Sequence, residues 1–246
     1  MPAAETPHHE HETLLGADTF PTICTSLDHF RLIVRDDLHR WNDLCETNTY
    51  LLSLDGLSGV GKSTLTENLH HIVRCIPGVD LYRLAVDRFI ATPRDSLLRR
   101  CMTDSRASFW KLIYDRQTMI DVAKRIVQAN GAACSIPVAT LYNRENGSVG
   151  QGMVSVPPGR KVVLMDGIDS TRIQEELSVR TPSCPQMRVF VYAHPHVALE
   201  RAAKRDTKRS LRTLQEGREY RRREFQYLVP QIIGQNMGHV DIIYMG

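Results

Sequence analysis

Residues 51–65 read LLSLDGLSGVGKSTL, and this stretch decides the fold. The apolar run up to Leu54 predicts a buried strand, and the apolar periodicity that starts at Leu65 predicts a helix. Between them lies G-x-x-x-x-G-K-S, the pattern of a phosphate-binding loop (Walker A) in its required strand–loop–helix context. A glycine-rich turn with a chance lysine is the alternative interpretation, and that context argues against it.

The chemistry of such a loop follows from its residue types. Glycines allow the backbone N–H groups to turn inward around a phosphate chain, and the helix that follows adds the positive end of its dipole. Lys62 is placed to reach the β- and γ-phosphates, and Ser63 offers a hydroxyl to Mg²⁺. We therefore expect a nucleoside triphosphate to bind here. The expected contacts are Gly56, Ser58, Gly59, Val60, Gly61, Lys62, Ser63 and Thr64.

The composition is that of an ordinary α/β protein. The chain has 246 residues, a net charge of +3 and six cysteines that occur singly, so neither a zinc site nor a disulfide framework is indicated. No apolar run is long enough to cross a bilayer, and residues 1–20 lack the basic and apolar segments of a secretion signal. We expect a cytoplasmic protein without a membrane partner. Its tail at residues 1–25 is expected to be disordered, and residues 26–246 to form one domain that starts with a helix.

Predicted helices and strands alternate along the chain. Besides the helix at the loop, helical periodicity lies at residues 26–44, 94–102, 117–130, 172–179 and from 196 onward. Besides the strand before the loop, strand patterns lie at residues 80–86, 133–138, 152–156, 161–165, 188–193 and 239–244. This alternation predicts an α/β fold of the P-loop NTPase type, a doubly wound and mostly parallel sheet flanked by helices.

Three aspartates follow predicted strands: Asp55, Asp87 and Asp166. Each of them alone fits a helix cap or a turn. Ligands of doubly wound sheets collect at the carboxyl ends of the strands, however, so all three are expected beside the phosphate loop. Phosphoryl transfer needs a carboxylate that positions the metal and a group that accepts the proton of the acceptor hydroxyl. Asp87 and Asp166 are candidates for both roles, with Ser63 as the third metal ligand, and the assignment between the two aspartates stays open.

The order of the motifs resembles the uridine kinase family and its relatives, phosphoribulokinase and bacterial pantothenate kinase. After the phosphate loop come D-x-F at residues 87–89, I-P at 136–137, D-G-I at 166–168 and R-x-x-x-R-D at 201–206. The resemblance covers residues 50–246. It implies an ATP- and Mg²⁺-dependent kinase, a transferase that moves the γ-phosphoryl group to a hydroxyl of a small molecule. A nucleoside is the first choice of acceptor.

The resemblance also assigns roles to single residues. Asp87 matches the general base of the family, and Phe89 completes its D-x-F motif. Tyr114 and Asp115 resemble the segment that contacts the substrate, and Asp166 stands where the family has the glutamate of a Walker B-like strand. All five are therefore expected on the substrate side of the site.

A basic helical lid is implied by the segment ERAAKRDTKR at residues 200–209. Arg201 and Arg205, with Arg209 as a third candidate, resemble lid arginines that close over ATP and neutralise charge on the transferring phosphoryl group. Arg205 completes an expected catalytic set with Lys62 and Asp87. A solvated helix face and a nucleic-acid patch are the alternative interpretations. The scarcity of interleaved aromatic residues argues against nucleic acid.

The acceptor side departs from the uridine kinases. They carry a tyrosine directly after I-P-x and a histidine a few residues on, whereas Ala139 follows the I-P-V of residues 136–138 here. Tyr142 and Arg144 are the remaining candidates for contacts with the acceptor. Two further hypotheses therefore stay open: a kinase for a sugar, a pantothenate-like compound or another alcohol, and a nucleotide-binding regulator that has lost transfer. A homo-oligomer is also left open.

Overall fold

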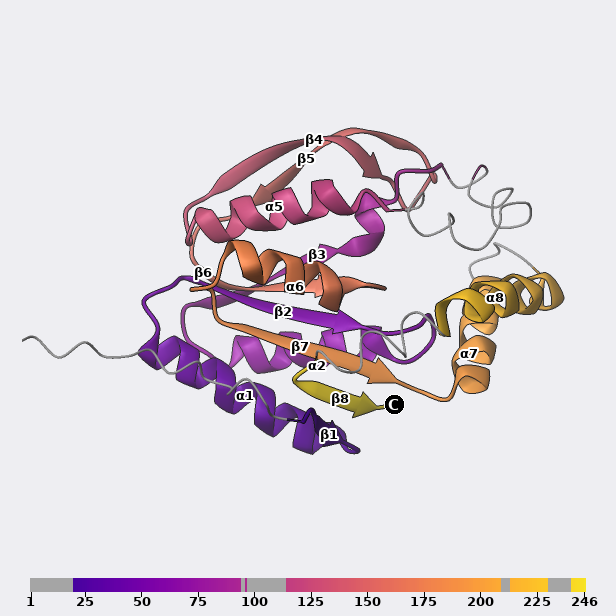
Figure 1. Cartoon of the computed structure of the whole chain (residues 1–246), viewed down its shortest axis with the longest axis horizontal. Helices are drawn as coiled ribbons and strands as arrows, with labels where there is room; N and C mark the ends of the chain where they lie inside the picture. The colour runs from indigo at the N-terminus through magenta and orange to yellow at the C-terminus, as the bar shows by residue number, and fades with distance from the viewer. Residues whose placement is uncertain (1–19, 94–95, 97–113, 209–212, 230–239) are drawn as a thin grey trace, which may run out of the picture.

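The computed structural model describes residues 20–93, 96, 114–208, 213–229 and 240–246. Figure 1 shows a central sheet with helices on both faces and a pair of helices, α7 and α8, beyond one end of it. The strands are β1 (Thr22–Cys24), β2 (Thr49–Asp55), β3 (Val79–Ala85), β4 (Cys134–Tyr142), β5 (Val149–Val156), β6 (Arg160–Asp166), β7 (Gln186–Tyr192) and β8 (Ile242–Met245). The helices are α1 (Leu27–Leu44), α2 (Lys62–Arg74), the 3₁₀ turn η1 (Val86–Phe89), α5 (Arg116–Gln128), α6 (Ser170–Arg180), α7 (Pro195–Lys208) and α8 (Leu214–Leu228). The helix predicted at residues 94–102 lies outside the described residues.

The main sheet is parallel throughout. Its six strands have the order β1-β8-β7-β2-β6-β3, and each neighbouring pair is parallel. Every residue of β2 is buried, as expected for a central strand that is covered on both faces. The carboxyl ends of β3, β6 and β2 lie side by side. The α/β class and the doubly wound parallel sheet are thus confirmed.

Two hydrophobic clusters fill the space on the two sides of the sheet. One joins the sheet to α1 and α2 and includes Trp41 and Leu69, and the other joins it to α5 and α6 and includes Met119 and Ile173. Trp41 packs against Tyr50 of β2 with ring centroids 5.4 Å apart. The loop after β2 is therefore carried by a strand that is packed from both sides.

The N-terminal boundary of the domain differs from the prediction. Residues 22–24, which we expected in a disordered tail, form β1 and pair in parallel with β8 from Thr22↔Ile242 to Cys24↔Tyr244. The pairing satisfies backbone groups along the edge of β8, and the Cys24 side chain is fully buried. A strand of three residues carries too short a pattern to be recognised in the sequence. Residues 1–19 lie outside the described residues.

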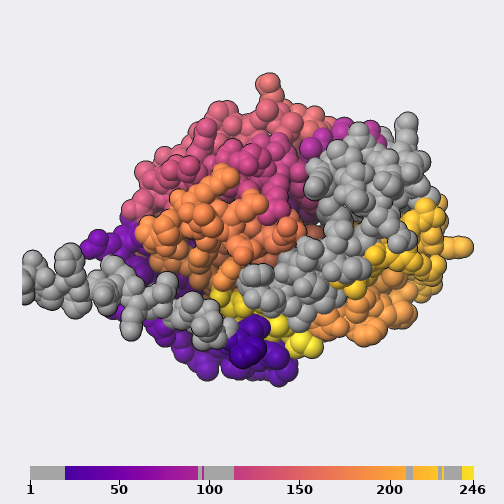
Figure 2. All heavy atoms as spheres, in the orientation of Figure 1, coloured from indigo at the N-terminus to yellow at the C-terminus, as the bar shows by residue number. Residues whose placement is uncertain are grey.

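Strands β4 and β5 do not join the main sheet. They form an antiparallel hairpin that pairs from Cys134↔Val156 to Tyr142↔Val149. The hairpin lies over α5, on the side of α5 away from α6 (Figures 1 and 2). Its turn, residues 143–148, places Arg144 against Asp87 at the carboxyl ends of the main strands. The strand patterns were predicted, but an alternation of period two does not say which sheet a strand joins.

Helices α7 and α8, which we call the lid helices, follow β7 and pack on each other. Thr213 opens α8 with a capping box: its hydroxyl accepts a hydrogen bond from the Glu216 N–H (3.3 Å), and its own N–H donates to the Glu216 carboxylate (2.8 Å). The expected lid residue Arg209 falls between the two helices, outside the described residues. Neither the lid helices nor any other described helix is long and apolar enough to cross a membrane.

Candidate active site

Two glycines let the loop between β2 and α2 fold tightly. Gly59 has a φ of +84°, and a Cβ there would lie 2.1 Å from the carbonyl oxygen of Ala198, so the loop rests directly on α7. Gly61, with a φ of +110°, is the N-cap of α2 and supplies no side-chain cap. The amino-terminal turn of α2 therefore opens into the loop, where its N–H groups suit a phosphate.

Lys62 is the central cation of the site. Its Nζ donates hydrogen bonds to the carbonyl oxygens of Gly56 (2.6 Å) and Leu57 (2.9 Å). Burial lowers the pKa of Lys62, and the negative charges of Asp166, Asp55 and Asp87 oppose this effect. The predicted carboxylates and the predicted lysine are thus close enough to interact, as expected from the strand order.

Asp55 has a structural role. Its side chain is fully buried, and its Oδ1 accepts hydrogen bonds from the N–H groups of Gly56 (2.6 Å) and Asp169 (3.0 Å). Its Oδ2 accepts from the N–H (3.3 Å) and the hydroxyl (2.6 Å) of Thr171. Asp55 therefore ties the start of the loop to the start of α6.

Asp87 lies in η1, directly after β3, and meets two other elements. The guanidinium of Arg144, on the hairpin turn, donates to Asp87 Oδ2, and the Tyr114 hydroxyl donates to Oδ1 (3.4 Å). Burial raises the pKa of Tyr114 well above its ordinary value, and the charges of Asp87 and Glu224 add to the rise. The structure thus brings together three of the predicted substrate residues, Asp87, Tyr114 and Arg144.

Asp166 ends β6 and is buried, with an exposed fraction of 7 %. Its Oδ2 accepts two hydrogen bonds from the guanidinium of Arg83 on the neighbouring strand β3, one of them 3.0 Å long. Arg83 could not be predicted from the sequence, because a basic residue two positions before a strand end shows no signal of its partner across the sheet. The pairing holds the carboxylate in place beside Lys62.

The residues for Mg²⁺ fit the chemistry of that ion. Ser63 is exposed at the start of α2. The negative charges of Asp166 and Asp87 raise the pKa of the neighbouring Lys62, against the effect of burial. Hydroxyl and carboxylate oxygens are hard ligands, and Mg²⁺ usually completes its shell with water and phosphate oxygens. Across the described residues no group of three or more His, Cys, Asp or Glu side chains is arranged to hold a metal, so a site made of protein side chains alone is not indicated there.

Other predicted substrate residues have structural roles. Phe89 is 1 % exposed and belongs to the hydrophobic cluster under α5, so in this conformation it has no surface for a substrate. Asp115 is the N-cap of α5, and its carboxylate accepts hydrogen bonds from the Thr118 N–H (3.1 Å) and hydroxyl (2.7 Å) and from the Thr140 hydroxyl (3.0 Å). Burial raises the pKa of Asp115, but these hydrogen bonds outweigh it and lower the pKa. Tyr142 is half-buried at the end of β4.

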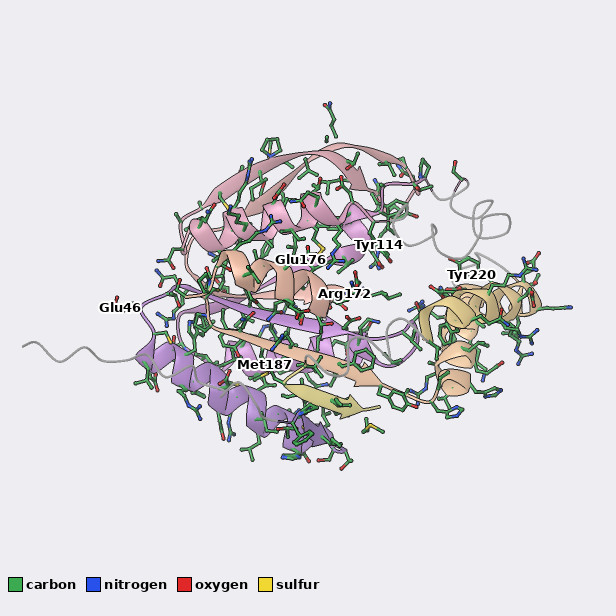
Figure 3. All side chains as sticks on the ribbon, in the orientation of Figure 1. Glu46, Tyr114, Arg172, Glu176, Met187 and Tyr220 are labelled. Carbon is green, nitrogen blue, oxygen red and sulfur yellow. The ribbon has the colours of Figure 1, made fainter. Side chains whose placement is uncertain are left out.

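Helix α6 adds a charged cluster at the same edge of the sheet. Its N-cap Asp169, at a φ of +69°, lies 3.5 Å from a guanidinium nitrogen of Arg116 and 3.8 Å from one of Arg172. Burial raises the pKa of Asp169 to about 6, since Arg116 and Arg172 compensate only part of the desolvation. Figure 3 shows Arg172 and Tyr114 at the end of the sheet nearest to α8, which carries Tyr220.

The lid helices bring arginines to the phosphate loop. The positive charge of Arg205 adds to the lowering of the Lys62 pKa, whereas Arg201 is exposed on α7. Arg205 Nε lies 3.8 Å from the carboxylate of Asp206, which is also on α7.

Arg221 of α8 is a second residue beside the predicted site, after Arg83, that the sequence did not reveal. Its guanidinium donates to both carboxylate oxygens of Asp206 (3.1 and 3.0 Å), to Glu224 and to the hydroxyl of Ser58 in the phosphate loop (3.3 Å). Burial lowers the pKa of Arg221, but the negative charges around it outweigh burial and raise it. In the sequence Arg221 is one of three successive arginines, so only the burial of the folded protein distinguishes it.

Acidic residues compensate much of the basic charge of the lid helices. Arg218 pairs with Glu200 (2.8 Å), and Arg222 and Arg223 both pair with Glu219 (3.2 and 2.9 Å). Several arginines of this segment therefore form ion pairs within the lid helices and are less available to an external anion.

Comparisons with known proteins identify the fold. No protein-family model and no curated protein matches the chain. Among solved structures, a candidate fructose transport system kinase from Silicibacter sp. TM1040 matches with a TM-score of 0.59 and 14 % identity, over 88 % of this chain and 98 % of the other. The chain has the fold of the P-loop kinases.

Two further P-loop kinase structures agree. A candidate P-loop-containing kinase with a circular permutation, from Saccharomyces cerevisiae, matches with a TM-score of 0.57 and 13 % identity, over 88 % of this chain and 99 % of the other. D-glycerate 3-kinase from Cryptococcus neoformans var. grubii matches with a TM-score of 0.54 and 12 % identity, over 83 % and 89 %. The predicted P-loop kinase fold is confirmed.

Proposed function

We propose that this P-loop kinase fold transfers the γ-phosphoryl group of ATP, with Mg²⁺, to a hydroxyl of a small molecule. One observation carries the proposal: the phosphate loop with Lys62 follows β2 at the sheet edge where β6 ends at Asp166 and Asp87 follows β3, and the same loop rests on α7, which carries Arg205. These are the parts that phosphoryl transfer needs, namely a cation for the phosphates, carboxylates for the metal and the hydroxyl proton, and a lid cation for the developing charge.

The residues divide the work as follows. Lys62 exchanges its two carbonyl partners for oxygens of the β- and γ-phosphates, and Arg205 neutralises charge on the transferring group. Asp87 orients the acceptor hydroxyl and takes its proton. Ser63 and Asp166 would hold Mg²⁺, which supplies charge neutralisation when it is bound. The lid helices exclude water, which otherwise competes as the acceptor.

A kinase fits these residues better than the two alternatives. A regulator without transfer has no need of a carboxylate that reaches an acceptor, whereas Asp87 is partly exposed at 33 % and lies beside the loop. A nucleic-acid surface needs cations that are open to phosphates, whereas several lid arginines are paired with glutamates. A nucleoside was the first choice of acceptor from the sequence, and the names of two similar structures, a fructose transport system kinase and a D-glycerate 3-kinase, point to smaller alcohols.

The test is ADP release from ATP and Mg²⁺ across a panel of nucleosides, sugars and hydroxy acids. At least one acceptor is expected to accelerate ADP release in the wild-type protein, and Lys62→Ala is expected to abolish it while the melting temperature stays close to that of the wild type. The matched control is Lys124→Ala on α5, away from the loop. Equal turnover by Lys62→Ala and the wild type would refute the kinase proposal.

A further inference from the structure

The predicted base, Asp87, is held by an ion pair that a substrate must change. Arg144 donates to its Oδ2 and Tyr114 to its Oδ1, so both carboxylate oxygens already accept a hydrogen bond. Neither member of the ion pair is buried, since the side chains of Arg144 and Asp87 are 52 % and 33 % exposed. An acceptor hydroxyl that binds Asp87 must therefore displace Arg144 from the carboxylate or donate to an oxygen that already accepts a hydrogen bond.

The hairpin turn does not depend on this ion pair. The Asn143 N–H donates to the Ser148 carbonyl (2.9 Å), and the Gly147 N–H donates to the Asn143 carbonyl (2.8 Å). The Asn143 side chain also accepts from the Glu145 N–H (2.8 Å). With the backbone of the turn tied in this way, the Arg144 side chain can change its partner while its own Cα stays in place.

The charge of the ion pair selects the kind of acceptor. A neutral acceptor that displaces Arg144 breaks its ion pair with Asp87 and offers no carboxylate in exchange, and the lost attraction weakens binding. An acceptor with a carboxylate can take the place of the Asp87 carboxylate at Arg144. It can bind the guanidinium with both of its oxygens, the geometry that guanidinium groups favour. We propose that the acceptor is a small hydroxy acid, whose carboxylate binds Arg144 while its hydroxyl binds Asp87. This inference rests on the proposed kinase function and names its acceptor class.

Direct contact between the two side chains also limits the size of the acceptor. Because Arg144 and Asp87 touch, the carboxylate and the reacting hydroxyl of one bound molecule must be close together. A hydroxyl on the second or third carbon of the acid meets this condition. A nucleoside has no anionic group for Arg144, so its binding would use other contacts.

The bonds and the proton of the transfer step can then be followed. The acceptor oxygen forms a bond to the γ-phosphorus of ATP while its proton passes to Asp87. The bond from the γ-phosphorus to the β,γ-bridging oxygen breaks, and its electron pair leaves with ADP. Asp87 later returns the proton to solvent, and Arg144 pairs with Asp87 again when the phosphorylated acid departs.

The experiment compares acceptors that differ only in charge. Glycerate, its neutral amide, glycerol and uridine are tested for ADP release with the wild type and with Arg144→Gln, Arg144→Lys and Arg35→Gln. Arg35 is the matched control, because it is also half-exposed (51 %) and paired with an aspartate, on α1. In parallel, calorimetry measures glycerate binding in the presence of a non-hydrolysable ATP analogue.

Glycerate is expected to bind and to be phosphorylated, and the neutral compounds to be poor acceptors. Arg144→Gln is expected to weaken glycerate binding and to raise its KM roughly 10- to 100-fold, with the KM for ATP nearly unchanged and partial recovery in Arg144→Lys. Glycerate binding that is equal in wild type and Arg144→Gln, or absent from both, overturns the inference. Efficient phosphorylation of uridine or glycerol by the wild type also overturns the inference but leaves the kinase proposal intact. A wild-type protein that neither binds ATP nor turns over any acceptor would refute the kinase proposal itself.

Discussion

Replacing Arg221 by methionine tests whether the second lid helix is held onto the phosphate loop by one buried cation. The change removes the bonds to Asp206, Glu224 and Ser58 but keeps a side chain of similar length. The Asp206 and Glu224 side chains are only 3 % and 10 % exposed, so each loses its partner in a poorly hydrated place. Breaking a buried ion pair in this way costs about 3–5 kcal/mol.

Two features of the structure reduce that figure for Arg221→Met. Arg205 lies 3.8 Å from Asp206 and compensates part of its charge. Glu224 lies on the same helix as Arg221, three residues further on, so its side chain can turn toward solvent when Arg221 is replaced. We therefore expect the free energy of opening of α7 and α8 to fall by about 2–3 kcal/mol. This corresponds to a roughly 30- to 150-fold loss of hydrogen-exchange protection in these helices.

Hydrogen exchange followed by mass spectrometry measures this effect, with Arg222→Met as the control. Arg222 is the next residue of the same helix and pairs with Glu219, but its side chain is 64 % exposed, so its replacement should change stability by less than about 1 kcal/mol. Arg221→Met should also raise the KM for ATP, because Ser58 loses its lid contact. Equal protection in the two variants would show that the buried ion pairs do not hold the lid.

Three further predictions concern the site. Asp87→Asn should leave ATP affinity near normal and lower kcat by a factor on the order of 10²–10⁴, whereas Asp166→Asn should chiefly raise the Mg²⁺ requirement; steady-state kinetics with varied Mg²⁺ would show the reverse if the two roles are exchanged. Arg205→Ala should lower kcat more than it raises the KM for ATP, and a change confined to KM would place Arg205 in ground-state binding alone. The raised pKa of Asp169, from 3.8 to about 6, means that the folded protein binds the proton more tightly than the unfolded chain, so this residue favours folding at low pH and the benefit is lost as the pH rises from about 4 to 6. Urea unfolding should therefore show Asp169→Asn gaining stability relative to the wild type by up to about 3 kcal/mol between pH 4 and pH 7, and a pH-independent difference would contradict the assigned cause.

The sequence predicted those parts of the site that local patterns encode. The loop from Gly56 to Lys62 and the aspartates at the ends of β3 and β6 have such patterns, and the structure brings them together as the parallel strand order requires. The pairings of Arg83 with Asp166 and of Arg221 with Asp206 join residues from different elements, and no local pattern distinguishes either arginine from its exposed neighbours. Phe89 is packed in the hydrophobic cluster and Asp115 caps α5, and neither role could be predicted, for a related reason. A motif position does not reveal whether the side chain is used for packing or for a helix cap.

The strand order also determines when the ATP site can assemble during synthesis. None of the first three strands of the main sheet pairs with another of them: β1 pairs with β8, β2 with β6 and β7, and β3 with β6. The phosphate loop is thus translated early but has no sheet to carry it until β6 emerges from the ribosome, and no lid until α7 follows. Such pairing between distant segments slows folding, and it leaves the apolar strand β2 exposed on the nascent chain in the meantime. This kinase fold should therefore depend on chaperones that bind extended apolar segments more than a protein of the same size with local strand pairing does.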